Sequence, residues 1–180
     1  MHYRKNMGKR IPVITPIHSK WKSQCGRYTV SVTNSCFIKM LELYRQYFPK
    51  EIGSSLIGYY SNDGFDAYVL DIAPISSDSI AERFSLYRGI EGLLKFFRKL
   101  VKAHHGQIYY IGEWHSHPNG VPIPSNTDDV NQIQISNDPK TNCPESILVI
   151  LGGNFIEKPE IGVFVYPRKK NRIKLHYEKN

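Results

Sequence analysis

Residues 112–118 have the sequence GEWHSHP, and an aspartate, Asp128, follows ten residues later. If residues 107–117 form a strand, His115 and His117 point to the same face, because side chains in a strand alternate with a period of two. Asp128 then has to return across a turn to complete the set. Two imidazoles and a carboxylate leave one position of a tetrahedral metal open, as in catalytic rather than structural zinc sites. The stretch therefore predicts a metal site. The alternative is an exposed, turn-rich loop with two unrelated histidines.

Ser125 and Asp128 also fit the pattern S-x-x-D, the acidic variant of a capping box, and predict a helix from residue 125 to about 137. The Ser125 hydroxyl can accept a backbone N–H while its proton is donated elsewhere, for instance to a developing oxyanion. The helix dipole favours the ionised form of Asp128 that a metal ligand needs. Asp129 is a rival ligand, but it breaks the spacing and we expect it to point to solvent. Capping of a helix without any metal remains the alternative.

A hydrolytic metal site also needs a general base, and two carboxylates are candidates. Glu113 lies on the same predicted strand face as the histidines, but four residues of strand place it about 13 Å from His117. That distance favours either a role in supporting His115 without touching the metal or a role at the surface. Glu51 lies at a predicted junction between a helix and a strand. The chemistry of these residues alone does not choose between Glu51 and Glu113.

Composition favours one ordinary globular domain of 180 residues, with 41% hydrophobic and 22% charged residues. The three cysteines are widely spaced, which argues against a disulfide framework and for a reducing, cytoplasmic compartment. We find neither a run long enough to span a membrane nor a signal peptide.

Positive charge gathers at the two ends of the chain. Residues 1–27 carry seven Lys or Arg and no acid, and residues 157–180 carry seven against three acids, so of the net charge of +8 the part between has 8 − 7 − 4 = −3. We therefore expect a basic N-terminal arm at residues 1–27 and a single catalytic domain at residues 28–180. Such ends are usually solvated, although they can also dock an acidic partner or nucleic acid.

Hydrophobic periodicity predicts alternating strands and helices. The expected strands cover residues 28–33, 54–61, 65–73, 107–114, 147–151, 161–166 and 172–177, with a short extended piece at residues 11–17. The expected helices cover residues 35–48, 89–105 and 125–137. Asn34 or Ser35 is the expected cap of the first helix, Asn62-Asp63-Gly64 is a hairpin signal, and residues 79–87 are open between a helical turn and a short strand. This order indicates an α/β (α+β) sandwich built on a mostly antiparallel sheet.

The two halves of the motif together resemble the JAMM (MPN-plus, JAB-domain) metalloproteases over roughly residues 28–166. The upstream element of that family, E-x-G-G-x-L-x-G, is matched by Glu51, Gly53, Leu56 and Gly58, with Ser54 in place of the second glycine. The resemblance implies a cytidine-deaminase-like JAB/MPN fold with a curved sheet flanked by helices. It also implies that His115, His117 and Asp128 bind one Zn²⁺ per chain, that Glu51 takes a proton from the attacking water, and that Ser125 hydrogen-bonds the tetrahedral intermediate.

The sequence GEWHSHP differs from the G-W-Y-H-[S/T]-H-P motif of eukaryotic deubiquitinases. It resembles the corresponding sequence of compact prokaryotic JAB proteins. These include the deconjugating peptidases found in CBASS anti-phage operons beside E1- and E2-like enzymes. The resemblance implies cleavage of an amide or isopeptide bond after the extended C-terminal tail of a protein conjugated to a target. Our narrower expectation is a CBASS-type deconjugase that acts on a conjugated cyclic-oligonucleotide synthase.

Several alternatives stay open or are disfavoured. A processing peptidase that exposes the C-terminal diglycine of a ubiquitin-like or sulfur-carrier protein would use the same active site. A non-catalytic MPN scaffold usually lacks ligands that this chain keeps. Nucleic-acid binding lacks a reader motif, and a zinc nucleobase deaminase would need H-x-E with P-C-x-x-C. We also expect that an edge strand near residues 65–72 receives the substrate tail by β-augmentation.

Overall fold

The computed structural model describes residues 17–154 and 158–178. Its elements are β1 (Ile17–Ser23), β2 (Thr29–Thr33), α1 (Asn34–Tyr47), β3 (Gly53–Tyr60), β4 (Asp66–Ile72), β5 (Ile80–Ala81), β6 (Leu86–Tyr87), α2 (Leu93–Ala103), β7 (Tyr109–Ser116), α3 (Asn126–Asn137), β8 (Glu145–Asn154), β9 (Lys158–Pro167) and β10 (Ile173–Tyr177). Within the described residues, none of the helices combines the length and the apolar character needed to cross a membrane.

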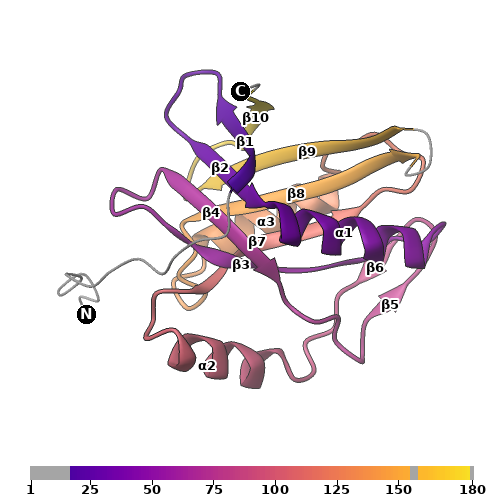
Figure 1. Ribbon diagram of the computed structural model, residues 1–180, viewed down its shortest axis with the longest axis horizontal. Helices are drawn as coiled ribbons and strands as arrows, with labels where there is room; N and C mark the ends of the chain where they lie inside the picture. Colours follow the sequence, from indigo (N-terminus) through magenta and orange to yellow (C-terminus); the bar gives the residue numbers. More distant parts are fainter. Residues whose placement is uncertain (1–16, 155–157, 179–180) are drawn as a thin grey trace.

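Eight strands close into a barrel in the order β1-β10-β9-β8-β7-β3-β4-β2, and β5 and β6 form a separate small hairpin (Figure 1). Six of the eight pairings in the barrel are antiparallel. The two parallel pairs are β2–β4 and β7–β8. A parallel pair needs a crossover connection, and α3 supplies the one between β7 and β8. The predicted α+β fold with a curved, mostly antiparallel sheet is confirmed, and the sheet curves far enough to close.

Side chains of the barrel strands alternate between two apolar layers. Leu56 of β3 joins a large core cluster with Met40 and Tyr44 of α1, whereas its neighbour Ile57 packs with α2 on the other face. Strand β8 shows the same alternation, because Leu148 belongs to a third cluster with residues of β9. Helix α1 therefore covers the inner face of the curved sheet, and α2 packs outside it, as the view in Figure 1 also shows.

The prediction of a basic arm at residues 1–27 is wrong for residues 17–23, because these residues form β1. This strand pairs with β2 on one side and with β10 on the other, so it closes the barrel. Trp21 supplies its main apolar anchor and is 3% exposed, while Lys20 and Lys22 alternate with it. Because few of its side chains are apolar, the segment lacks the hydrophobic alternation that would have identified it. The extended piece expected at residues 11–17 lies, except for Ile17, outside the described residues.

Other expectations need smaller corrections. Helix α1 is capped by Thr33, whose hydroxyl accepts the Cys36 N–H, and not by Asn34 or Ser35. Residues 79–87 contain the β5–β6 hairpin. Helix α2 begins at Leu93 rather than at residue 89, after Gly92 in a left-handed conformation (φ 77°).

Strand β4, expected to be a free edge for a substrate tail, is paired on both sides, with β2 and with β3. That expectation is wrong, because barrel closure leaves its backbone groups without free positions for a further strand.

The glycines of the upstream sequence element allow close approach between strands. A Cβ atom at Gly53 would lie 2.2 Å from the Trp114 carbonyl oxygen, and one at Gly58 would lie 1.9 Å from the Tyr68 carbonyl oxygen. Ser54 stands where the family pattern has a glycine, and hydrogen bonds of its side chain accommodate it. Its buried hydroxyl donates to the Ala73 carbonyl (2.8 Å) and accepts the Trp114 indole N–H (2.9 Å).

We predict that Ser54→Ala lowers the free energy of unfolding by about 1–3 kcal/mol, because it leaves the buried Trp114 N–H without an acceptor. Urea denaturation measures the change. Ser35→Ala, at an exposed serine in α1, is the control and should cause a smaller loss. Equal losses in the two variants would contradict the structural role of the Ser54 hydroxyl.

Candidate metal centre

Reciprocal hydrogen bonds between Ser116 and Ile52 bring the upstream glutamate to the histidines. The Ile52 N–H donates to the Ser116 hydroxyl (3.0 Å), and the Ser116 N–H donates to the Ile52 carbonyl (2.8 Å). Gly53 pairs with His115 in the β3–β7 register. Glu51 is thereby placed next to the histidine pair although it lies 64 residues before His115.

The loop after β7 fixes the second histidine. The His117 N–H donates to the Leu151 carbonyl (2.7 Å), and its ring Nδ1 lies 3.1 Å from the Val121 carbonyl oxygen. A carbonyl can only accept, so Nδ1 carries the proton and Nε2 presents its lone pair. The proline-rich loop lies close against β8, where a Cβ at Gly152 would be 2.6 Å from the Gly120 carbonyl oxygen.

Helix α3 presents Asp128 through a complete capping box. The Asp128 N–H donates to the Ser125 hydroxyl (3.2 Å), and the Ser125 N–H donates to Asp128 Oδ2 (2.8 Å). The expected capping pattern is confirmed. With Oδ2 occupied by the cap, Oδ1 faces His115 Nε2 at 3.4 Å.

The ligand atoms of His115, His117 and Asp128 converge, all within 4.8 Å of one another. The two Nε2 atoms are 3.0 Å apart, and the carboxylate oxygens lie 3.4 Å from His115 Nε2 and 3.7 Å from His117 Nε2. Two atoms that each bond a tetrahedral zinc at about 2.0–2.1 Å are about 3.3–3.4 Å apart. The 3.4 Å separation, which is from Asp128 Oδ1, matches this value, and the 3.0 Å separation of the two Nε2 atoms is slightly shorter, so the residues fit a zinc ion. The 3.7 Å separation is from Oδ2, the oxygen engaged by the cap.

Electrostatics also suit metal ligation. Burial of His115 lowers its pKa, which keeps the imidazole neutral as a ligand requires. Burial raises the pKa of Asp128, but hydrogen bonds from His115 and Ser125 outweigh burial and hold that pKa well below its usual range. His115 is therefore suited to bind a metal as a neutral nitrogen donor, and Asp128 as a carboxylate.

Glu51 follows α1 and its cap, directly before β3, and is half-buried. Burial raises the pKa of its carboxyl group. The nearby His117 lowers this pKa, and the nearby Asp128 raises it. Glu113, the other candidate base, is buried, forms an ion pair with Arg88 and accepts a hydrogen bond from the Tyr110 hydroxyl instead. Of its two expected roles, support of His115 or a role at the surface, the surface role is wrong.

Two side chains of α3 differ from expectation. The exposed Ser125 hydroxyl donates its proton to Asp128 Oδ2 (2.7 Å) rather than toward the open side of the site. Asp129, expected in solvent, accepts from the Tyr166 hydroxyl (2.6 Å) and from Arg172 (2.5 Å). These bonds turn Asp129 away from the metal ligands and fix the first turn of α3 against β9.

The supporting partners Ser116, Val121 and Arg88 were not identified from sequence. The sequence held a signal for Ser116. It lies between two histidines on a predicted strand, so its side chain points to the opposite face from theirs, toward the interior. Val121 acts through its backbone carbonyl, so its identity carries none.

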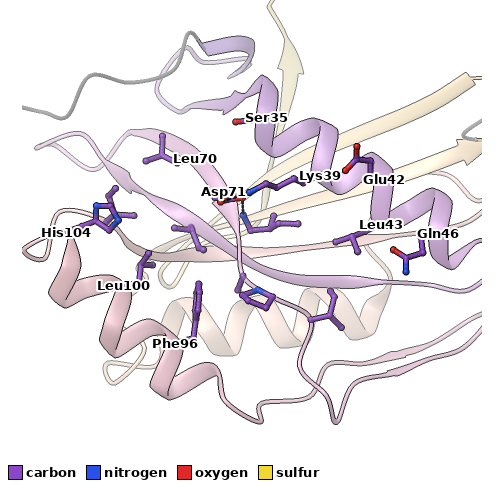
Figure 2. A pocket seen from close by; sticks show the side chains of 16 residues that line it. Ser35, Lys39, Glu42, Leu43, Gln46, Leu70, Asp71, Phe96, Leu100 and His104 are labelled. Atoms are coloured by element: carbon purple, nitrogen blue, oxygen red, sulfur yellow. Dashed lines mark hydrogen bonds and ion pairs between the residues drawn. The ribbon is translucent and has the colours of Figure 1, made fainter.

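A large groove lies away from the candidate metal centre. A cavity of about 820 Å³ opens between α1 and α2 over β4, with Lys39 and Asp71 paired at 2.8 Å above its apolar floor (Figure 2). Neither Glu51 nor any of the metal ligands lines it.

Comparison with known proteins agrees with this geometry. Residues 33–163 match the family of prokaryotic homologs of the JAB domain. A protein of Enterobacter hormaechei subsp. hoffmannii (strain UCI 50), named CD-NTase/cGAS isopeptidase, is 31% identical over 155 residues, which cover 86% of this chain and 84% of that protein. A protein of Escherichia coli (strain TW11681) with the same name is 35% identical over 94 residues, 51% of this chain and 58% of the relative.

The fold is also similar to the solution structure of a protein from Desulfitobacterium hafniense, with a TM-score of 0.55 and 20% identity. The match covers 83% of this chain and 90% of that one. At this identity the likeness bears on the fold alone.

We predict that the purified protein binds about one zinc ion per chain and that His117→Ala abolishes this binding, because it removes one of three protein ligands. Elemental analysis and calorimetric titration with zinc measure the stoichiometry. His104→Ala, at an exposed histidine after α2, should bind zinc as the wild type does. Retention of zinc by His117→Ala would exclude the assigned ligand set.

Proposed function

Because this chain belongs to the family of prokaryotic homologs of the JAB domain, we propose that it is a zinc-dependent isopeptidase of the JAMM type. The observation that carries the proposal is the convergence of His115, His117 and Asp128 beside the half-buried carboxylate of Glu51. The name that both bacterial relatives share supports a deconjugating activity. The substrate proposed is a CD-NTase-type nucleotide synthase joined to a target through its C-terminal tail, in cytoplasmic anti-phage defence with E1- and E2-like partners.

The proposed reaction is hydrolysis of an amide or isopeptide bond. His115, His117 and Asp128 would hold the zinc ion, which would supply Lewis acidity to lower the pKa of water and to polarise the scissile carbonyl. Glu51 accepts a proton from the attacking water as the C–O bond forms. It then returns that proton to the nitrogen of the leaving amine as the C–N bond breaks, so one water is consumed for each bond cleaved.

Ser125 is proposed to donate a hydrogen bond to the developing oxyanion. In the structure its proton is engaged by Asp128 Oδ2, so this role requires its hydroxyl to rotate when substrate binds. Hydroxyl rotors turn readily, and Asp128 keeps its other bond from the Ser125 N–H when that happens.

We predict that Glu51→Gln keeps the fold and the zinc but lowers kcat/KM by at least about 100-fold, because the amide cannot accept the proton. The assay uses a protein conjugate with an isopeptide-linked C-terminal tail, and a linear fusion after the same tail separates deconjugation from precursor processing. Glu42→Gln, at an exposed glutamate on α1, should cleave normally. Normal cleavage by Glu51→Gln would remove Glu51 from the mechanism, and absence of cleavage by the wild type would favour a scaffold.

The β5–β6 hairpin is the proposed docking place of the tail. Among the described strands, only β5 and β6 lie outside the closed barrel, so they keep backbone positions that an extended peptide can use. The hairpin adjoins the base, since the Glu51 N–H donates to the Glu82 carbonyl (2.7 Å). Its tip carries Phe84, which is 83% exposed.

We predict that Phe84→Ala raises KM for the conjugate by roughly tenfold with little change in kcat, because it removes apolar contact made with the bound tail. Steady-state kinetics separate the two constants. Ile38→Ala, at an exposed isoleucine on the outer side of α1, is the control. An equal change in both variants would place tail binding elsewhere.

A further inference from the structure

The carboxylate of Glu113 is occupied on both oxygens. Oε1 accepts from the Tyr110 hydroxyl at 2.8 Å and from the Ser55 hydroxyl at 3.4 Å, and Oε2 lies 2.5 Å from Arg88 Nη1. The Glu113 side chain is 11% exposed and that of Arg88 is 26% exposed. Glu113 is thus a buried anion that needs its arginine, because an unpaired buried charge is strongly unfavourable.

Arg88 connects the β5–β6 hairpin to the strand that carries the histidines. It follows Tyr87, the last residue of β6, and its partner Glu113 lies two residues before His115 on β7. On the other side of the hairpin, the carbonyl of Glu82 accepts the N–H of the proposed base, Glu51. The hairpin therefore contacts both the metal-binding strand and the backbone of the base.

Apolar packing contributes little to holding the hairpin in place. Ile80, Phe84 and Tyr87 are 57%, 83% and 61% exposed. Next to the hairpin lies a cavity of about 160 Å³, which Arg88 and Glu113 line together with serines of β3 and of the loop after β4. Since few side chains of the hairpin are buried, its position depends on its polar contacts.

We propose that the Arg88–Glu113 ion pair is a positioning contact, which holds the β5–β6 hairpin against β7 and thereby keeps Glu51 in place at the metal centre. Neither residue touches the reacting atoms. The inference rests on the proposed function, since it concerns the base of that reaction. It gives Glu113 a task distinct from proton transfer and explains why an acidic residue precedes the histidines.

Two variants test the contact. Glu113→Gln removes one charge, and the double variant Arg88→Met/Glu113→Gln removes both, so that no unpaired buried charge threatens the fold. Glu178→Gln, which removes the acidic partner of the Lys20–Glu178 pair between β1 and the end of β10, is the control. Hydrogen exchange of the Glu51 amide reports the hairpin contact directly, the amide of Val149 in β8 reports global stability, and zinc content and kcat/KM are measured in parallel.

In both test variants we expect the Glu51 amide to exchange roughly tenfold faster, as expected when one hydrogen bond is lost, with Val149 and zinc content unchanged. We also expect kcat/KM to fall by about tenfold, mainly through kcat. Unchanged exchange at Glu51 would overturn the proposal, and so would faster exchange with wild-type kcat/KM. If the wild type cleaves no conjugate, the proposed function fails, while faster exchange in the variants still supports the positioning contact.

Discussion

The pairing of β3 with β7 is the constraint on which the site depends. The two hydrogen bonds between Ser116 and Ile52 join the strand that carries the histidines to the segment that carries the glutamate. Gly53 makes this possible, because any side chain there would collide with the backbone of Trp114. Glu51, far away in sequence, is thus brought beside the histidines by backbone contacts between paired strands, the kind of preorganisation on which the proposed reaction would depend.

Asp128 shows how one side chain serves both fold and site. Its Oδ2 completes the capping box with Ser125, while its Oδ1 faces His115. The helix start that orients the carboxylate also favours its charged form. Asp129, one residue later, points away from the histidines, because it accepts hydrogen bonds from Tyr166 and Arg172 on the side of β9. The geometry of a helical turn, not residue type, separates the ligand from its neighbour.

The convergence of His115, His117 and Asp128 and most elements were predictable from sequence because they depend on local periodicity and on the spacing within one motif. The β1 strand was not, since Trp21 is its main buried anchor and its partners β2 and β10 are selected by barrel closure. The shorter α2 has a local cause that periodicity does not register: the Asp78 carboxylate accepts the N–H groups of Ile90 and Glu91 and holds them in a loop. Glu113 was predicted on the strand face of the histidines. Its partner Arg88, however, directly follows residues 79–87, whose conformation the sequence left open.

Barrel closure has a consequence for the unit that folds. The residues matched by the family, 33–163, leave out β1, nearly all of β2, and β10. In a fragment cut at those limits the barrel would be open, and β4 and β9 would be unpaired edge strands. Such edges promote intermolecular pairing and aggregation. The segment matched by the family is therefore smaller than the closed barrel, and the candidate ligand His115 on β7 depends on strands that contribute no candidate ligand.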